Sequence, residues 1–177
     1  MDTSKIKDFW GIKKSTKISD KPENLKTLEE LEDIVDSLKN KRKKIVFTNG
    51  CFDILHKGHV KILKEMKELG DVLIVALNSD SSVRNFKGEG RPINNEIDRA
   101  FVIGNIKGVD YVVIFDENDP LNILRRLKPD VHVKGGNPIP ERVSMEKEIV
   151  ESYGGKLICL DLVDGYSTTE IMERIKG

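Results

Sequence analysis

The sequence has few cysteines, no excess of charge and no long apolar run. Its 177 residues include only Cys51 and Cys159, too few for a disulfide framework, and we expect both to be small buried side chains in a reducing compartment. No apolar run approaches the roughly 18 residues that cross a membrane, and the N-terminus has no signal-peptide core. We therefore expect a cytoplasmic protein that does not enter membranes.

Positive and negative charges balance, with 30 Lys and Arg residues against 30 Asp and Glu residues. Proteins that bind nucleic acid or anionic membrane surfaces usually have a basic excess, so neither partner is expected. The basic stretch 39–44 is interpreted as a solvated helix end. The zero net charge and the many apolar runs also argue against disorder of the whole chain. A chain of this length is typical of one domain with its own core.

The residue pattern changes near position 27. Residues 1–26 are mostly polar, with Phe9 and Trp10 among their few apolar anchors, and we interpret them as an N-terminal extension. Thr27 and Glu30 form a capping-box pair, which predicts that a helix begins there. Residues 27–177 are expected to form the domain.

Beyond this helix, short apolar runs alternate with helical patterns. Runs of strand length cover 45–47, 72–77, 111–115, 131–133 and 157–160. Helical patterns cover 59–69, 93–105, 120–127, 141–153 and a last stretch from about 167. This alternation predicts an α/β domain with a doubly wound five-stranded parallel sheet and helices on both faces.

In such a sheet, ligands bind beyond the carboxyl ends of the strands. The loops that follow the predicted strands are rich in glycine and polar residues, and they cover 48–59, 78–92, 116–119, 134–140 and 161–169. Topology and composition therefore agree in predicting a ligand site at this edge of the sheet.

The first of these loops ends with two histidines, His56 and His59, at the start of a helix. Residues three apart share a helix face, and the free N–H groups of a helix N-terminus attract anions. Gly58 between them lets a ligand approach the backbone. Two imidazoles in this place predict hydrogen bonds to a phosphoryl group. A zinc site is not indicated, because the third histidine, His132, lies within a predicted strand.

Two common nucleotide-binding motifs are missing. The first strand is followed neither by Gly-x-x-x-x-Gly-Lys-Ser/Thr nor by Gly-x-Gly-x-x-Gly, which argues against P-loop kinases and dinucleotide-dependent dehydrogenases. From Gly50 to His59 the residues instead fit the frame Gly-x-Phe-Asp-x-x-His-x-Gly-His. This stretch resembles the nucleotidyltransferase superfamily, whose hallmark is His-x-Gly-His.

The resemblance extends along nearly all of 27–177. It is closest to the adenylyltransferase domain that makes ADP-heptose from D-glycero-β-D-manno-heptose 1-phosphate, a domain often fused to a sugar kinase. Matching stretches are Leu77-Asn78-Ser79-Asp80, Lys87-Gly88 with Arg91-Pro92, Val133-Lys134-Gly135-Gly136 and Ser167-Thr168-Thr169. Where that family usually has Asp-Tyr, this chain has Asn137-Pro138, in a loop expected to face the base or the acceptor.

The resemblance implies a Rossmann-like fold and transfer of AMP from ATP to the sugar 1-phosphate, with release of pyrophosphate. ATP is then a substrate, and Mg²⁺ is expected to be held by its triphosphate rather than by a protein cage. A homodimer is common in the family. Two alternatives stay open: a cytidylyltransferase that acts on glycerol 3-phosphate or another phosphorylated acceptor, and a non-catalytic nucleotide-binding module.

The resemblance also implies roles for individual residues. The catalytic residues are expected to be His56, His59 and Lys87, which neutralise phosphate charge. Contacts to the nucleotide are expected from Thr48, Asn49, Gly50, Phe52, Asp53, Gly58, Asn78, Asp80, Arg91, Lys134, Gly135, Gly136, Asn137, Ser167, Thr168 and Thr169. Arg99 is a further candidate, although a surface pair with Asp98 is the ordinary alternative. Turn formation by Asp53 and helix capping by the hydroxyls at 167–169 are alternatives of the same kind.

Overall fold

The computed structural model describes residues 21–136, 140–161 and 168–176. Its five strands form one parallel sheet in the order β3-β2-β1-β4-β5. The strands are β1 (Ile45–Gly50), β2 (Val72–Asn78), β3 (Tyr111–Phe115), β4 (Val131–Gly135) and β5 (Lys156–Leu160). The chain extends the sheet through β2 and β3 on one side and then through β4 and β5 on the other. This arrangement confirms the predicted doubly wound sheet, whose strand order reverses between β1 and β4.

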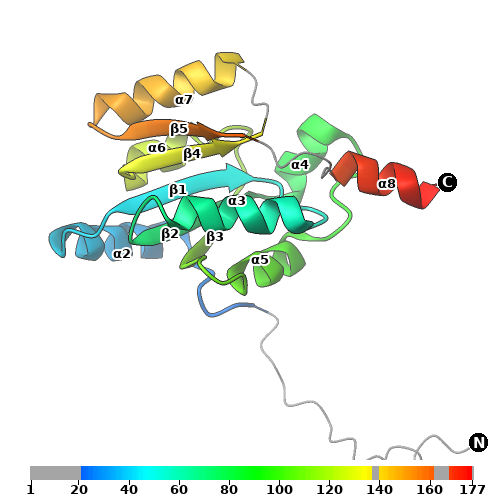
Figure 1. The fold of residues 1–177 in the computed structure, drawn as a ribbon, viewed down its shortest axis with the longest axis horizontal. Coiled ribbons are helices and arrows are strands. Elements are labelled where there is room, and N and C mark those ends of the chain that lie inside the picture. Colours follow the sequence, from blue (N-terminus) through cyan, green and yellow to red (C-terminus); the bar gives the residue numbers. More distant parts are fainter. Residues whose placement is uncertain (1–20, 137–139, 162–167, 177) are drawn as a thin grey trace, which may run out of the picture.

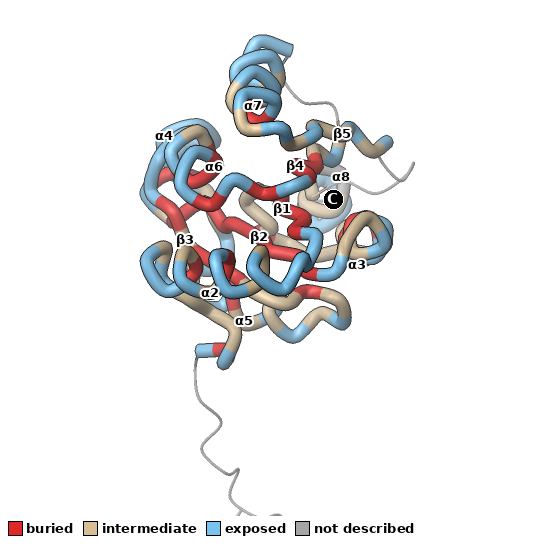
Figure 2. Tube along the Cα trace, turned by 90° about the vertical axis from the view of Figure 1, so that its left-hand side faces the viewer, coloured by how far each residue is buried: buried red, intermediate tan, exposed pale blue. Residues whose placement is uncertain are grey.

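Helices cover both faces of the sheet (Figure 1). One face packs against α2 (Leu28–Asn40), α6 (Leu121–Leu127) and α7 (Pro140–Ser152), and the other against α3 (Lys57–Lys67) and α5 (Glu96–Gly104). Side chains alternate across each strand, so Ile45 and Phe47 enter the first core while Val46 enters the second. Figure 2 shows the buried residues concentrated along the central strands.

Two further helices, α4 (Asp80–Lys87) and α8 (Thr168–Lys176), lie beyond the carboxyl ends of the strands (Figure 1). The sequence analysis treated 78–92 as a loop, which was wrong for residues 80–87. The helix begins because the Ser79 side chain accepts the Ser82 N–H at 3.2 Å. With only Ser82 and Val83 buried, its apolar pattern is too short to stand out in the sequence.

The described chain begins against the edge strand β3. Residues 22–26 were assigned to the extension by the sequence, yet Leu25 forms a bridge with Val112 and the Lys26 N–H donates to Val112 O at 2.9 Å. The rest of the expected extension, including Phe9 and Trp10, lies outside the described residues. Among the described residues, no helix is long and apolar enough to cross a membrane.

Candidate active site

The two histidines of the first loop meet at the start of α3, directly beyond β1. His56 is the N-cap residue in an extended conformation, and its ring centroid lies 3.9 Å from that of His59. The His59 Nδ1 atom accepts the His56 backbone N–H at 3.4 Å, so a neutral His59 carries its proton on Nε2, where it can be donated. The first turn of α3 has no acidic residue to offset the positive end of the helix dipole. This arrangement is suited to bind an anion.

The electrostatics of His59 also place Lys87 in this cluster. Burial, followed by the positive charges of His56 and Lys87, lowers the pKa of His59 to about 4. Lys87 lies beside Cys51 as well: burial raises the pKa of the Cys51 thiol, and the charge of Lys87 opposes that shift. The three residues predicted to be catalytic are therefore brought together, and His59 is neutral near pH 7 before any phosphate binds.

Asp53 joins the first loop to the segment before α5. Its buried carboxylate accepts the backbone N–H groups of Ile93 at 2.9 Å and Asn94 at 3.0 Å. The same carboxylate lies 3.0 Å from Arg91 Nε. These partners are about 40 residues away, so Asp53 does more than shape a local turn: it fixes the Arg91 segment beside the histidine loop.

Arg99 lies in the interior of the domain and joins three segments. Its guanidinium lies 2.8 Å from Asp80 Oδ1 and donates to Cys51 O at 2.6 Å and Asn94 O at 3.0 Å. The alternative of a surface pair with Asp98 was wrong, because the Arg99 side chain is fully buried and pairs with Asp80. Both Arg99 and Asp80 therefore hold the site together, and the Asp80 carboxylate is already engaged by the chain.

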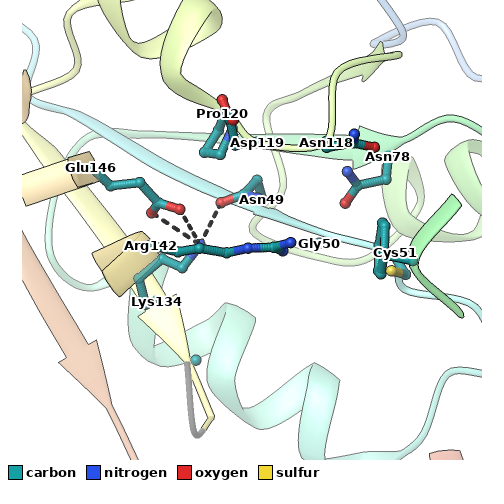
Figure 3. Close-up of a pocket in the computed structure, with 12 residues that line it drawn as sticks. Asn49, Gly50, Cys51, Asn78, Asn118, Asp119, Pro120, Lys134, Arg142 and Glu146 are labelled. Carbon is teal, nitrogen blue, oxygen red and sulfur yellow. Dashed lines mark hydrogen bonds and ion pairs between the residues drawn. The ribbon is translucent and has the colours of Figure 1, made fainter. Parts of the chain in front are cut away.

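A cavity of about 250 Å³ opens beside this cluster, at the ends of β1, β2 and β4 (Figure 3). Cys51 lines this cavity and also lies beside Lys87, so it connects the cavity to the histidine cluster. The polar side chains around it are Asn49, Asn78, Asn118, Asp119, Lys134, Arg142 and Glu146. The sequence predicted Asn49, Gly50, Asn78, Lys134 and Gly135 as ligand contacts, and all of these line the cavity.

The sequence did not predict seven of the lining residues, of which four have amide or charged side chains: Asn118, Asp119, Arg142 and Glu146. The 116–119 loop was expected to face the site, but it carries no motif that singles out one residue. Arg142 and Glu146 lie four residues apart on α7 and so share one face. An acidic and a basic residue at this spacing are common on solvated helices, so the pattern alone gave no reason to select them.

Lys134 is tied to two neighbouring elements on the wall of the cavity (Figure 3). Its ammonium donates to Asn49 Oδ1 at 3.1 Å and lies 3.0 Å from each carboxylate oxygen of Glu146. The Glu146 Oε2 atom is in turn 2.6 Å from Nε2 of His132, which is buried within β4 as predicted. Burial alone would raise the pKa of Glu146, but the His132 hydrogen bond and the Lys134 charge hold it below its ordinary value.

Several other predicted contact residues have structural partners. Thr48 is buried and donates to Val133 O at 2.9 Å, which links β1 to β4. Asn78 donates to Ser82 Oγ at 3.1 Å at the start of α4. A Cβ atom at Gly135 would overlap the Cδ1 end of the Ile62 side chain on α3, so any other residue here would require that side chain to move.

The remaining predicted residues lie around the first loop. Phe52 packs against the His59 ring with centroids 5.4 Å apart, and Gly58 is buried in α3. Thr168 at the start of α8 donates to Ile54 O at 3.2 Å, and Arg91 contacts the Met172 sulfur. Gly136 has a positive φ of 97° at the end of β4. Asn137 and Ser167 lie outside the described residues, as does the side chain of Thr169.

Comparison with known proteins identifies the family. The family model for cytidylyltransferase-like proteins matches residues 47–174, which include the histidine loop, the residues that line the cavity and most of α8. The chain belongs to the cytidylyltransferase-like family. This result confirms the resemblance found in residues 50–59 and makes the chain a nucleotidyltransferase domain.

Curated relatives extend this likeness over most of the chain. The bifunctional protein HldE of Campylobacter concisus is 56% identical over 153 residues, 86% of this chain and 31% of that protein. HldE of Geobacter metallireducens is 52% identical over 157 residues, 89% of this chain and 32% of that protein. The chain therefore spans about a third of the length of these relatives.

A solved structure shows the same relationship. The lipopolysaccharide core biosynthesis protein from Thermoplasma volcanium shares 32% sequence identity with a TM-score of 0.58, and the match covers 71% of this chain and 99% of that one.

Within the described residues, no three His, Cys, Asp or Glu side chains are grouped so as to hold a metal ion.

The charge of Lys87 should have a measurable effect on the pKa of His59. In ligand-free protein, NMR titration of the imidazole is expected to give a pKa near 4 for His59. Replacing Lys87 with Met removes a nearby positive charge and should raise this pKa toward the ordinary value of about 6.5. The exposed Lys61→Met variant on α3 serves as the control and should leave it unchanged. An unshifted His59 pKa in Lys87→Met would contradict the cluster described here.

The buried Arg99 should matter far more to stability than a surface arginine. Arg99→Met leaves Asp80 and two carbonyls without their partner, so we expect a loss of about 3 kcal/mol in the free energy of unfolding. Arg126→Met, which breaks the exposed pairs with Glu29 and Glu32, should leave the urea midpoint nearly unchanged. Arg99→Lys keeps the charge but lacks the fork and should recover only part of the loss. Equal urea midpoints for Arg99→Met and Arg126→Met would show that Arg99 is not a structural link.

Proposed function

We propose that this chain transfers AMP from ATP to D-glycero-β-D-manno-heptose 1-phosphate, releasing pyrophosphate and forming ADP-heptose. The observation that carries the proposal is that two sites lie next to each other. One is the cluster of His56, His59 and Lys87 at the start of α3, and the other is the adjacent cavity with its lysine, arginine, amide and carboxylate groups. The first is suited to a polyphosphate and the second to a phosphorylated, hydroxyl-rich acceptor.

The volume of the cavity favours the acceptor over the nucleotide, which changes the expected ligand of the predicted lining residues, Asn49 and Lys134 among them. Pockets for drug-sized ligands usually measure about 300–1,000 Å³, so a cavity of about 250 Å³ suits a smaller molecule. Lys134 and Arg142 would bind the acceptor phosphate, and Asp119 and the amides around the cavity would bind its hydroxyl groups. The triphosphate of ATP would then lie over the N-terminus of α3, next to Lys87.

The reaction needs positioning and charge neutralisation more than acid–base chemistry. An oxygen of the acceptor phosphate attacks the α-phosphorus in line, the new P–O bond forms, and the bond to the β-phosphate bridge breaks as pyrophosphate leaves. The attacking phosphate is already anionic, so no base has to remove a proton. His56, His59, Lys87 and the α3 backbone N–H groups stabilise the charge that develops on the transferred phosphoryl group. Mg²⁺ would arrive with the triphosphate as part of the substrate.

The neutral state of His59 suits this role. With the proton on Nε2, the imidazole can donate a hydrogen bond to phosphate without adding a further buried positive charge next to His56 and Lys87. A bound phosphate would favour the protonated form and raise the His59 pKa.

The names of the relatives agree with the proposal. HldE is called bifunctional, and this chain matches about a third of it, which is in keeping with a transferase domain that is fused to a second activity elsewhere. The Thermoplasma volcanium protein is named for lipopolysaccharide core biosynthesis, which fits the activation of a sugar phosphate. We further expect a cytoplasmic homodimer whose partners are small molecules and not nucleic acid.

A substrate panel tests the proposal directly. Pyrophosphate release is measured for ATP, CTP, GTP and UTP, each with heptose 1-phosphate and with glycerol 3-phosphate. We expect ATP with the heptose 1-phosphate to exceed CTP by about 10- to 10³-fold in kcat/KM, because one or two unpaired polar groups in the base pocket cost about 1–3 kcal/mol each. A preference for CTP with glycerol 3-phosphate would instead identify a cytidylyltransferase. Nucleotide binding without turnover of any acceptor would indicate a non-catalytic module.

The histidine cluster can be tested by substitution. His56→Ala and His59→Ala should each lower kcat by about 10²–10³, as for the loss of one preorganised donor in other active sites. Both residues are partly exposed at a helix start, so the thermal unfolding temperature should change little. Lys61→Ala on the exposed face of α3 is the matched control and should keep normal turnover. A well-folded histidine variant with the kcat of the parent would rule out the mechanism.

A further inference from the structure

A chain of buried polar groups leads from the cavity wall into the domain. His132 and Glu146 are 0% and 1% exposed, although histidine and glutamate are seldom so fully buried. His132 Nδ1 lies 3.3 Å from Phe47 O, and its Nε2 lies 2.6 Å from Glu146 Oε2. An ionised carboxylate only accepts, so Nε2 donates to Glu146, and with Nδ1 facing Phe47 O the imidazole is fixed between β1 and α7.

Burying such a pair is costly for stability. Replacing a buried ionic group with well-packed apolar side chains is often neutral or stabilising, so packing alone does not explain His132 and Glu146. Their effect is to hold a carboxylate directly behind Lys134. The pKa of Glu146 lies below its ordinary value despite burial, because the His132 hydrogen bond and the Lys134 charge outweigh desolvation. The carboxylate therefore stays ionised near neutral pH and keeps its attraction for the ammonium.

The Lys134 ammonium is thereby held in place, but its hydrogen-bonding capacity is not used up. An ammonium group has three N–H donors, and within the described part of the chain its partners are Asn49 and Glu146. At least one donor is left for a ligand in the cavity, which Lys134 lines (Figure 3). A free lysine side chain samples many rotamers, and fixing it in advance lowers the entropy cost of binding an anion.

We propose that Glu146 and His132 are positioning residues for substrate binding: Glu146 holds the Lys134 ammonium in place for the acceptor phosphate, and His132 fixes the Glu146 carboxylate. The proposal rests on the proposed function in placing the acceptor in this cavity. Neither residue touches the reacting atoms, and both act through Lys134. Because Lys134 would bind the acceptor phosphate, replacing Glu146 or His132 should raise the KM for the acceptor and leave the KM for ATP unchanged.

A double-mutant cycle tests this role. Glu146→Gln, Lys134→Ala and the double variant are compared for acceptor KM, ATP KM and kcat. We expect the acceptor KM to rise about tenfold or more in each single variant, with ATP KM and kcat within about threefold of the parent. The double variant should have nearly the same acceptor KM as Lys134→Ala, since Glu146 has nothing left to position. His132→Gln should show a smaller rise of the same kind.

The control is Glu151→Gln on the same helix, where Glu151 pairs with Lys147 at the surface, 3.8 Å away. It should leave all three kinetic constants unchanged. Multiplied losses in the double variant, or a rise in ATP KM equal to that in acceptor KM, would show that Glu146 supports the fold and would overturn the inference. A Glu146→Gln variant with the acceptor KM of the parent would do the same.

A second measurement separates this inference from the proposed function. Inorganic phosphate, the group shared by every candidate acceptor, is titrated into the ligand-free protein while the Asn49 side-chain amide is followed by NMR. Phosphate binding should weaken about tenfold in both Lys134→Ala and Glu146→Gln, whether or not the protein turns over heptose 1-phosphate. Failure of turnover with normal phosphate binding would contradict the proposed function alone. Equal phosphate affinity in the parent and Glu146→Gln would contradict the positioning role alone.

Discussion

The buried guanidinium of Arg99 holds the catalytic edge of this domain together. Three segments that are not paired in the sheet meet at this edge: the loop after β1, the start of α4 and the segment before α5. Arg99 binds one group from each, namely Cys51 O, the Asp80 carboxylate and Asn94 O. A planar group with several fixed donors can satisfy three acceptors at once, which a lysine cannot do. The histidine loop depends on this link, because Cys51 lies within it.

A second buried charge, the negative carboxylate of Asp53, links the same loop to neighbouring segments. Its carboxylate binds two backbone N–H groups before α5 and lies beside Arg91, whose guanidinium contacts Met172 of α8. Carboxylates and backbone groups therefore bind the two arginines, while His56, His59 and Lys87 form a cluster of their own. The charges that support the loop are thus distinct from those expected to bind phosphate.

The sequence predicted the sheet well and its connections less well. Apolar runs marked all five strands, most clearly β2, whose seven residues are all buried and apolar except Asn78, whereas the edge strand β5 has no buried residue. The α4 helix was missed, since eight residues with two buried side chains carry little periodic signal. The histidine loop was recognised because its residues are adjacent in the chain. The partners of Asp53 and Arg99 were not, because all but Asn94, which is close to Arg99 in the chain, come from distant segments and depend on the finished fold.

The same distinction separates the chemistry of the site from its specificity. His56 and His59, which are expected to bind phosphate, follow one strand and open one helix, so a short motif specifies them together, whereas Lys87 comes from the end of α4. The cavity instead takes side chains from β1, β2, β4, α7 and the 118–120 segment, and no two of these elements are linked by a fixed spacing. Under the proposed function, a change of acceptor would require substitutions in the cavity, such as at Arg142 or Asp119, and would leave the histidine loop intact. This is why the histidine loop indicates the reaction class, whereas the acceptor has to be inferred from the charges and volume of the cavity.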